Sequence, residues 1–309
     1  MKRRYIGWAV LIGVVAAVAG REERLAQAAD PARALPIFEV DRAWPKVPPQ
    51  WKLGDASSIA IDEHDNVWVL HRPRTLKPEQ AAMAAPPVIV FDTAGNYIKA
   101  WGGAGKGYEW PEREHGIHID YKGFVWLGGN SCPTNGLPGL KPVADDQLLK
   151  FTQDGRFVAQ IGHSNLSKGN ADTVNLHRPA DVWVYPPTNE LFVADGYGNH
   201  RVAVFDADSG KFKRMWGAFG NKPMDDDHCQ IVPQPSFSDP GQQFLYVGGG
   251  NGVYIVDRKT LEIVGNIQPP GIIGAGHQIA TDSKGNLYIA QTTAGLQKLT
   301  FKGMSPVSR

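Results

Sequence analysis

Cysteine, long apolar runs and helix-like periodicity are scarce in this sequence, and each scarcity excludes a class of protein. The two cysteines, Cys132 and Cys229, lack the close spacing of a metal knuckle or redox pair, so a disulfide-rich scaffold is excluded and a single bridge stays open. No stretch has the apolar spacing of an amphipathic helix. Because 32 Lys and Arg nearly balance 31 Asp and Glu, no field of one sign favours nucleic acid or an anionic membrane as a partner.

Motifs of several common enzyme classes are also missing. The chain has no phosphate-binding G-x-x-x-x-G-K-[ST] loop, no G-x-S-x-G nucleophile turn and no H-E-x-x-H zinc helix. The glycine run 248–252 is typical of a turn between strands. The acidic run 225–227 is better explained as a solvated loop than as a cation site.

The N-terminus has the pattern of an export signal. Three basic residues after Met1 precede an apolar run from Tyr5 to Ala19, and Ala26-Gln-Ala-Ala29 supplies the small residues of a cleavage site. The run has about 15 residues, short of the roughly 20 that cross a membrane. We expect residues 1–28 to be a signal peptide, with an uncleaved N-terminal anchor as the alternative. Both predict an exported protein, periplasmic or secreted, with no further membrane contact.

A repeated pattern fills the rest of the chain and predicts one domain over residues 35–303. Each copy has four short strands separated by Asp, Asn and Gly turns, which is typical of the blades of an all-β propeller. Five copies are visible, at 58–102, 116–162, 181–217, 244–265 and 278–299. The fifth copy lacks a fourth strand, and residues 37–44 resemble the fourth strands of the others. We therefore expect the N-terminal segment to complete the last blade and close the ring.

Three long inserts interrupt the repeats between strands. They span 74–87, 131–145 and 164–176. Because such loops gather on one face of a propeller, they are candidates for a substrate lid.

Aligned first strands place histidine at one register in three of the five copies. The position lies five residues before the residue that opens the turn (Asp62, Asp120, Tyr185, Pro233 or Asp282), and it holds Ser57, His115, Ala180, His228 and His277. First strands line the central channel, so one register means one height on the axis. Three neutral imidazoles with an open fourth position are the arrangement of a catalytic zinc site. The alternative is a set of channel histidines bonded to water and backbone.

Several stretches together resemble a known family. They are Gly54–Asp62 with His71 and Arg72, His115–Asp120, Pro179–Val182 with Asp195–Arg201, and His277–Ala280. They resemble NHL-repeat β-propellers of the peptidyl-α-hydroxyglycine α-amidating lyase (peptidylamidoglycolate lyase) family and its bacterial relatives, over most of the mature chain. The Asp-Gly-Tyr-x-Asn-x-Arg pattern followed by Trp-Gly is the more specific part.

The resemblance implies a metal-dependent carbon–nitrogen lyase acting on a small molecule or peptide. In that family three histidines bind zinc, a tyrosine is the base and an arginine binds the substrate, which here implies zinc at His115, His228 and His277, with Tyr197 as base and Arg72 as substrate ligand. The implied reaction cleaves the C–N bond of a carbinolamide to an amide and glyoxylate. The simpler readings are that Tyr197 caps a strand turn and that Arg72 pairs with a surface carboxylate.

Two features depart from the family. The family's calcium-binding aspartate is Gln278 here, a neutral ligand that should hold calcium much less well; the matching backbone carbonyls are those of Ala56 and Ile117. The family also implies six blades, whereas five repeats are visible. Either the ring closes with five, or residues 225–238 supply a degenerate sixth, and in either case His228 can be displaced from the axis.

Two other functions remain open from the sequence. The first is a non-catalytic exported propeller that binds a peptide or a protein partner, because propellers carry many unrelated functions. The second is a calcium-dependent hydrolase of the gluconolactonase type. That chemistry prefers carboxylate and Asn ligands in the channel, and the aligned positions here are histidines, so we rank it last.

Overall fold

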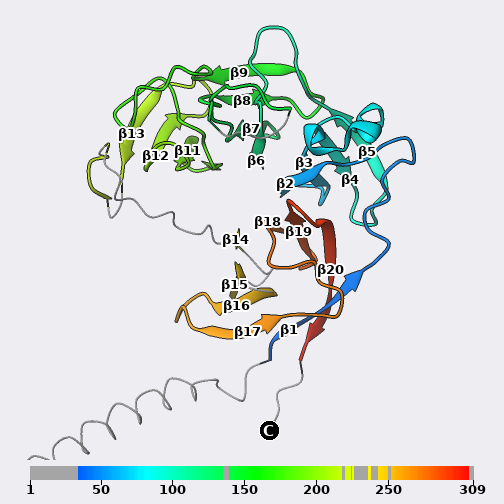
Figure 1. The fold of residues 1–309 in the computed structure, drawn as a ribbon. Helices are drawn as coiled ribbons and strands as arrows, with labels where there is room; N and C mark the ends of the chain where they lie inside the picture. Colours follow the sequence, from blue (N-terminus) through cyan, green and yellow to red (C-terminus); the bar gives the residue numbers. More distant parts are fainter. Residues whose placement is uncertain are drawn as a thin grey trace, which may run out of the picture. The chain divides into compact units, whose positions relative to one another are not determined.

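All described residues outside turns and loops form strands, apart from two short 3₁₀ helices. The computed structural model describes residues 34–134, 139–217, 220–223, 225, 236–237, 243–249 and 252–305. These residues form five four-stranded sheets, each a blade of a five-bladed β-propeller (Figure 1). The predicted all-β propeller is therefore confirmed.

The blades follow one another along the chain, and each runs in simple strand order. The first has β2 (Asp55–Ile61), β3 (Val67–Arg72), β4 (Val88–Phe91) and β5 (Tyr97–Trp101); the second has β6 (Glu114–Ile119), β7 (Val125–Gly129), β8 (Leu148–Phe151) and β9 (Phe157–Ile161). The third has β10 (Asp181–Tyr185), β11 (Glu190–Asp195), β12 (Arg201–Asp206) and β13 (Phe212–Trp216). The fourth has β14 (Ser236–Phe237), β15 (Phe244–Gly249), β16 (Gly252–Asp257) and β17 (Ile263–Ile267).

The fifth blade combines both ends of the propeller sequence. Its strands are β18 (Gln278–Thr281), β19 (Leu287–Gln291), β20 (Gly295–Met304) and β1 (Pro36–Asp41), with β1 as the outermost. Phe38 of β1 packs on Phe301 of β20, with ring centroids 5.9 Å apart. The prediction that the N-terminal segment completes the last blade is confirmed.

A repeated aspartate explains why three of the copies are so easily recognised. Asp62, Asp120 and Asp282 open the turn between the first two strands, and one carboxylate oxygen of each accepts the backbone N–H groups two and four residues on. The other oxygen accepts a hydrogen bond from a buried aromatic side chain of the second strand, at Trp68, Trp126 or Tyr288. The turn and the core therefore depend on the same side chain.

The apolar cores lie between neighbouring blades. Trp68 and Trp126 are almost completely buried, and Trp126 packs against Leu176, Val184 and Leu191 on its third-blade side. Burying one tryptophan contributes roughly 4–6 kcal/mol of transfer free energy, from 150–250 Å² at about 25 cal/mol/Å². These contacts join successive sheets and hold the first strands of the blades close to one another.

The fourth blade is the least regular. Ser236 and Phe237 of β14 pair with Tyr246 and Leu245, so they belong to this blade and not to a sixth. The sheets in the described part of the chain number five, as the visible repeats indicate and not as the family implies. β14 also follows Pro233, the residue that the repeat alignment took as the turn. This copy lacks the aspartate turn that fixes the register in blades one, two and five.

Several expectations fall partly or wholly outside the described residues. The signal segment 1–28, His228 and Cys229 are among the residues not described, so these predictions stay predictions. Within the described ranges, Cys132 has no disulfide partner and no helix is long and apolar enough to cross a membrane. The first insert contains η1 (Pro73–Thr75) and η2 (Pro78–Met83), between β3 and β4.

Two compact units make up the chain, and the site described below lies in one of them. Residues Phe38–Lys302 hold nearly all of the propeller. In the described ends of the other unit, Leu35 and Ser305 exchange two hydrogen bonds, of 2.6 and 2.9 Å.

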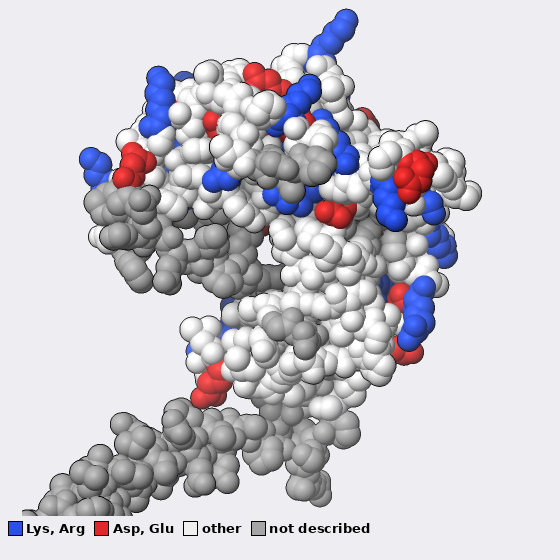
Figure 2. Space-filling view, viewed as in Figure 1, with Lys and Arg blue, Asp and Glu red and all other residues white. Residues whose placement is uncertain are grey.

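On the face seen in Figure 2, basic and acidic side chains are interspersed and not gathered in one patch of either sign.

Candidate functional site

The aligned first-strand positions meet in space. Nδ1 of His115, at the second position of β6, lies 2.7 Å from the carbonyl oxygen of Ala180, and Nδ1 of His277 lies 2.7 Å from that of Ser57. The two imidazole rings are 4.7 Å apart between centroids. Four of the five positions in the repeat alignment are therefore neighbours in space. The fifth, His228, lies outside the described residues.

Hydrogen bonding fixes the tautomer of both histidines. A carbonyl oxygen only accepts, so Nδ1 of each ring carries the proton and Nε2 keeps its lone pair. Burial lowers the pKa of His115 to about 3, and the neighbouring His277, Arg72 and Arg113 add to the effect. Partial burial also lowers the pKa of His277, with Arg72 and Arg113 contributing. Both imidazoles are therefore neutral at pH 7, with Nε2 free to accept a proton or hold a metal ion.

Tyr197 lies directly beside this pair. Its hydroxyl oxygen is 2.8 Å from Nε2 of His115, and since that nitrogen is the unprotonated one, the phenol donates the bond. The two rings meet edge to face, with centroids 4.8 Å apart. Of the residues that the resemblance implies, His115, His277 and Tyr197 are thus in direct contact.

The Asp-Gly-Tyr-x-Asn-x-Arg stretch builds the loop that presents Tyr197. Asp195 and Arg201 form a fully buried ion pair at 2.9 Å, and Asn199 donates to the same carboxylate oxygen. The other oxygen of Asp195 accepts the backbone N–H of His177, whose own carbonyl accepts the N–H of Gly198. A Cβ on Gly198 would lie 2.3 Å from the His177 ring, so glycine is required there.

Arg178 also contributes to the position of Tyr197. Its backbone has φ of 60°, a left-handed conformation that costs a non-glycine residue roughly 1–2 kcal/mol. In this conformation its guanidinium donates to the carbonyl oxygen of Tyr197. The sequence analysis did not identify Arg178, because positive φ leaves no signal at an arginine.

Arg72 is a buried cation with little compensation. It is only 4% exposed, and its one hydrogen bond is from Nε to the carbonyl oxygen of Glu114, at 2.8 Å. Among the described residues it has no ion pair within 4.0 Å, so the reading of Arg72 as the partner of a surface carboxylate does not describe its environment. Burial and the charge of Arg113 lower its pKa to about 10, against the attraction of Asp55, Glu114 and Tyr197.

Arg113 is a second cation that the sequence analysis missed. It lies two residues before His115, close enough to Arg72, His115 and His277 to lower the pKa of each. Its guanidinium has no hydrogen bond or ion pair to any residue in the described ranges. Arg113 directly precedes β6 and lies outside the aligned strand positions, so no sequence pattern marked it. Neither arginine has an ion pair in the described ranges, so the two positive charges together would attract an anion to this site.

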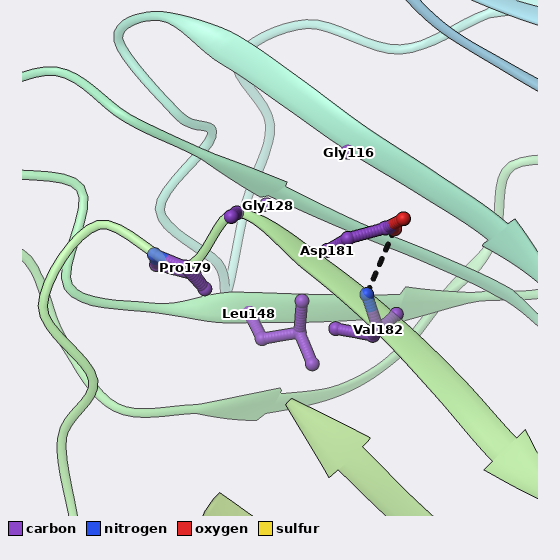
Figure 3. A pocket seen from close by; sticks show the side chains of 7 residues that line it. Gly116, Gly128, Leu148, Pro179, Asp181 and Val182 are labelled. Atoms are coloured by element: carbon purple, nitrogen blue, oxygen red, sulfur yellow. Dashed lines mark hydrogen bonds between the residues drawn. The ribbon is translucent and has the colours of Figure 1, made fainter. Parts of the chain in front are cut away.

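The positions implied for calcium form a different arrangement. Ala56 and Ile117 are buried on the first strands of blades one and two. Nε2 of Gln278, however, donates to Oδ2 of Asp181 at 3.3 Å, and Oδ1 of Asp181 accepts the N–H of Val182 at 2.8 Å (Figure 3). Asp181 is crowded by protein atoms on most sides although part of its surface stays accessible, and this desolvation raises its pKa to about 6.

The histidine pair fits a zinc ion in its donor chemistry. Both rings are neutral, and each is oriented by an Nδ1–H bond to a carbonyl, the usual outer support of a zinc-binding imidazole. In the described ranges no group of three His, Cys, Asp or Glu side chains is close enough to bind a metal. His115 and His277 would therefore provide two ligands to a metal bound here, and His228 stays the predicted third.

Fold and site together define the class of protein: a five-bladed β-propeller with a polar site built from two histidines, a tyrosine and a buried arginine. No protein-family model matches the chain. Sequence comparison identifies distant homologues. One is peptidyl-glycine alpha-amidating monooxygenase A of Xenopus laevis, 26% identical over 236 residues, which are 72% of this chain and 22% of that protein.

Two further homologues are shorter proteins. Peptidyl-alpha-hydroxyglycine alpha-amidating lyase 2 of Drosophila melanogaster is 24% identical over 197 residues, covering 60% of this chain and 43% of that protein. NHL repeat-containing protein 3 of Homo sapiens is 22% identical over 270 residues, covering 85% and 65%. The chain thus spans about a fifth of the frog monooxygenase and under half of the fly lyase. It is distantly homologous to these proteins.

Proposed function

We propose that this protein is a carbon–nitrogen lyase that cleaves carbinolamides of the N-acyl-α-hydroxyglycine type to an amide and glyoxylate. The observation that carries the proposal is the contact between Tyr197 and His115 beside the buried, ion-pair-free Arg72. The homology to an alpha-amidating lyase supports the same reaction class. Export, directed by residues 1–28, is part of the proposal.

Arg72 is the group for the substrate carboxylate. A buried guanidinium is costly unless an anion compensates it, and its terminal nitrogens have no partner among the described residues. A bound carboxylate would supply two charge-assisted hydrogen bonds in the fork geometry that arginine prefers. Arg113 adds positive charge on the same side and increases the attraction.

Tyr197 is the group for the substrate hydroxyl. Its oxygen is held at the axis by His115, close enough to Arg72 for the two to interact electrostatically. The tyrosinate form of Tyr197, favoured by the nearby Arg72 cation, would take the hydroxyl proton; as it does so, the carbonyl of glyoxylate forms and the C–N bond breaks. The amide nitrogen then takes a proton, so atoms and charges balance without an oxidant or reductant.

His115 and His277, with the predicted third ligand His228, would hold zinc, and Nε2 of His115 would then exchange its hydrogen bond from Tyr197 for the metal. Bound there, zinc supplies a Lewis acid that lowers the pKa of a coordinated hydroxyl. The protein's own contribution is to keep both imidazoles neutral and turned with Nε2 toward the axis. Burial keeps the rings neutral by lowering their pKa values, and the carbonyls of Ala180 and Ser57 orient them.

The test is release of glyoxylate from an N-acyl-α-hydroxyglycine by the purified full-length protein. Tyr197→Phe should lower kcat at least 100-fold, the lower end of the range for losing a general acid–base group. Tyr185→Phe is the matched control on the same blade, because that ring lies 39% exposed on β10. Activity that is absent in the wild type, or unchanged in Tyr197→Phe, would contradict the proposal and favour the non-catalytic binding propeller.

A further inference from the structure

A hydrogen bond between two blades lies one residue beyond the histidine pair. Gln278 directly follows His277 on β18, and Asp181 directly follows Ala180, the residue whose carbonyl orients His115. The Gln278 amide and the Asp181 carboxylate meet at 3.3 Å. The bond therefore links the strand that carries one histidine to the strand that supports the other.

The resemblance implies a calcium ion at this level, and the residues present do not fit one. Calcium requires six to eight oxygen ligands, whereas Gln278 directs an N–H group, not an oxygen, at the Asp181 carboxylate. Both oxygens of that carboxylate already accept N–H donors, from Gln278 and from Val182.

Local packing holds the carboxylate in place without an ion. A Cβ on Gly116 would lie 3.3 Å from Oδ1 of Asp181 and 2.8 Å from the carbonyl oxygen of Ala180. The missing side chain of Gly116 therefore lets the start of β10 pack directly against β6. The space lined by Gly116, Gly128, Pro179 and Asp181 is too narrow for a water molecule (Figure 3).

We propose that the Asp181–Gln278 hydrogen bond replaces a structural calcium ion and positions the His115–His277 pair without calcium. The inference does not depend on the lyase reaction, because it concerns the support of the histidines and not the chemistry they perform. Asp181 and Gln278 are positioning residues in this account.

Calcium-dependent melting of the full-length protein tests the proposal directly. The wild-type Tm should change by less than about 1 °C between excess calcium and chelator. Gln278→Asp places a second carboxylate against Asp181, so this variant should gain a calcium-dependent Tm increase of roughly 5–10 °C at calcium about 100 times its Kd. Gln153→Asp, which adds the same charge at the outer turn between β8 and β9, should gain none.

A second measurement reports on the histidines and not on stability. In protein labelled with ¹⁵N-histidine, the Nδ1–H signals of His115 and His277 should weaken through faster exchange in Asp181→Leu and Gln278→Leu. Asp181→Asn should preserve them, since an asparagine can still hydrogen-bond the Gln278 amide. The proposal is overturned if calcium stabilises the wild type and Asp181→Asn abolishes that effect. It is also overturned if both leucine variants keep the wild-type Nδ1–H signals. This NMR test does not use Gln278→Asp, so it remains valid if that variant fails to fold.

Discussion

Replacing Arg72 by methionine should separate stability from function. The side chain is 4% exposed, and burial together with Arg113 lowers its pKa to about 10. Since each pKa unit corresponds to about 1.4 kcal/mol, carrying this charge costs the folded state about 3 kcal/mol at pH 7. For a base with a lowered pKa this cost is complete below the folded-state value and declines only as the pH rises above about 10.

Arg72→Met removes that cost but also removes one hydrogen bond, and leaving the Glu114 carbonyl without a donor costs about 1–3 kcal/mol. The unfolding free energy at pH 7 should therefore stay unchanged or rise by up to about 2 kcal/mol, while the KM for glyoxylate release rises at least tenfold. Urea unfolding and steady-state kinetics measure the two effects. Arg214→Met is the control, because that guanidinium, on the outermost strand β13 of the third blade, is 48% exposed and pairs with Glu190 of β11.

A loss of more than about 2 kcal/mol in Arg72→Met would refute this reasoning. It would mean that the arginine is compensated in the folded protein and that its role is structural. An unchanged KM would equally exclude Arg72 as the ligand of the substrate carboxylate.

Two further predictions concern the fold. Asp120→Ala removes the acceptor of two turn N–H groups and of the buried Trp126 indole N–H. This variant should lower the free energy of unfolding by about 3 kcal/mol and Tm by roughly 6–12 °C. Asp154→Ala, at a side chain 92% exposed, is the control and should change neither. Burial raises the pKa of Glu114 to about 7, so ionisation penalises the folded state increasingly from about pH 4.5 to above pH 7, by about 3 kcal/mol in full. Glu114→Gln keeps the Trp110 bond and should stabilise the protein at pH 8 but hardly at pH 4.5, as chemical unfolding at both values would show. Equal effects at the two pH values would contradict it.

Sequence reasoning was successful where one residue leaves a local signal. The turn aspartates repeat with the strands, so the blades and the shared height of His115 and His277 could be predicted. The fourth copy has no such aspartate, and there the alignment put the turn at Pro233, before the observed strand β14. The sequence could not decide whether a sixth blade is present, because it contains no sixth copy of the repeat.

Contacts between blades were harder to predict. Asp181 and Gln278 are 97 residues apart in the sequence. They meet only because the folded propeller brings β10 close to β18. Arg113 belongs to no repeat register, so its charge near the axis could be recognised only once β6 was in place. Arg178 depends on a backbone angle that its residue type does not indicate.

The most direct test of the axial site is the zinc content of the purified full-length protein and of three histidine variants. His115→Ala and His277→Ala each remove a neutral, carbonyl-oriented imidazole, whereas His64→Ala, at a side chain 71% exposed, is the control. We predict about one zinc per chain in the wild type and in the control, and loss of zinc in both axial variants. Wild-type protein without zinc, or zinc retained by His115→Ala and His277→Ala, would contradict the site.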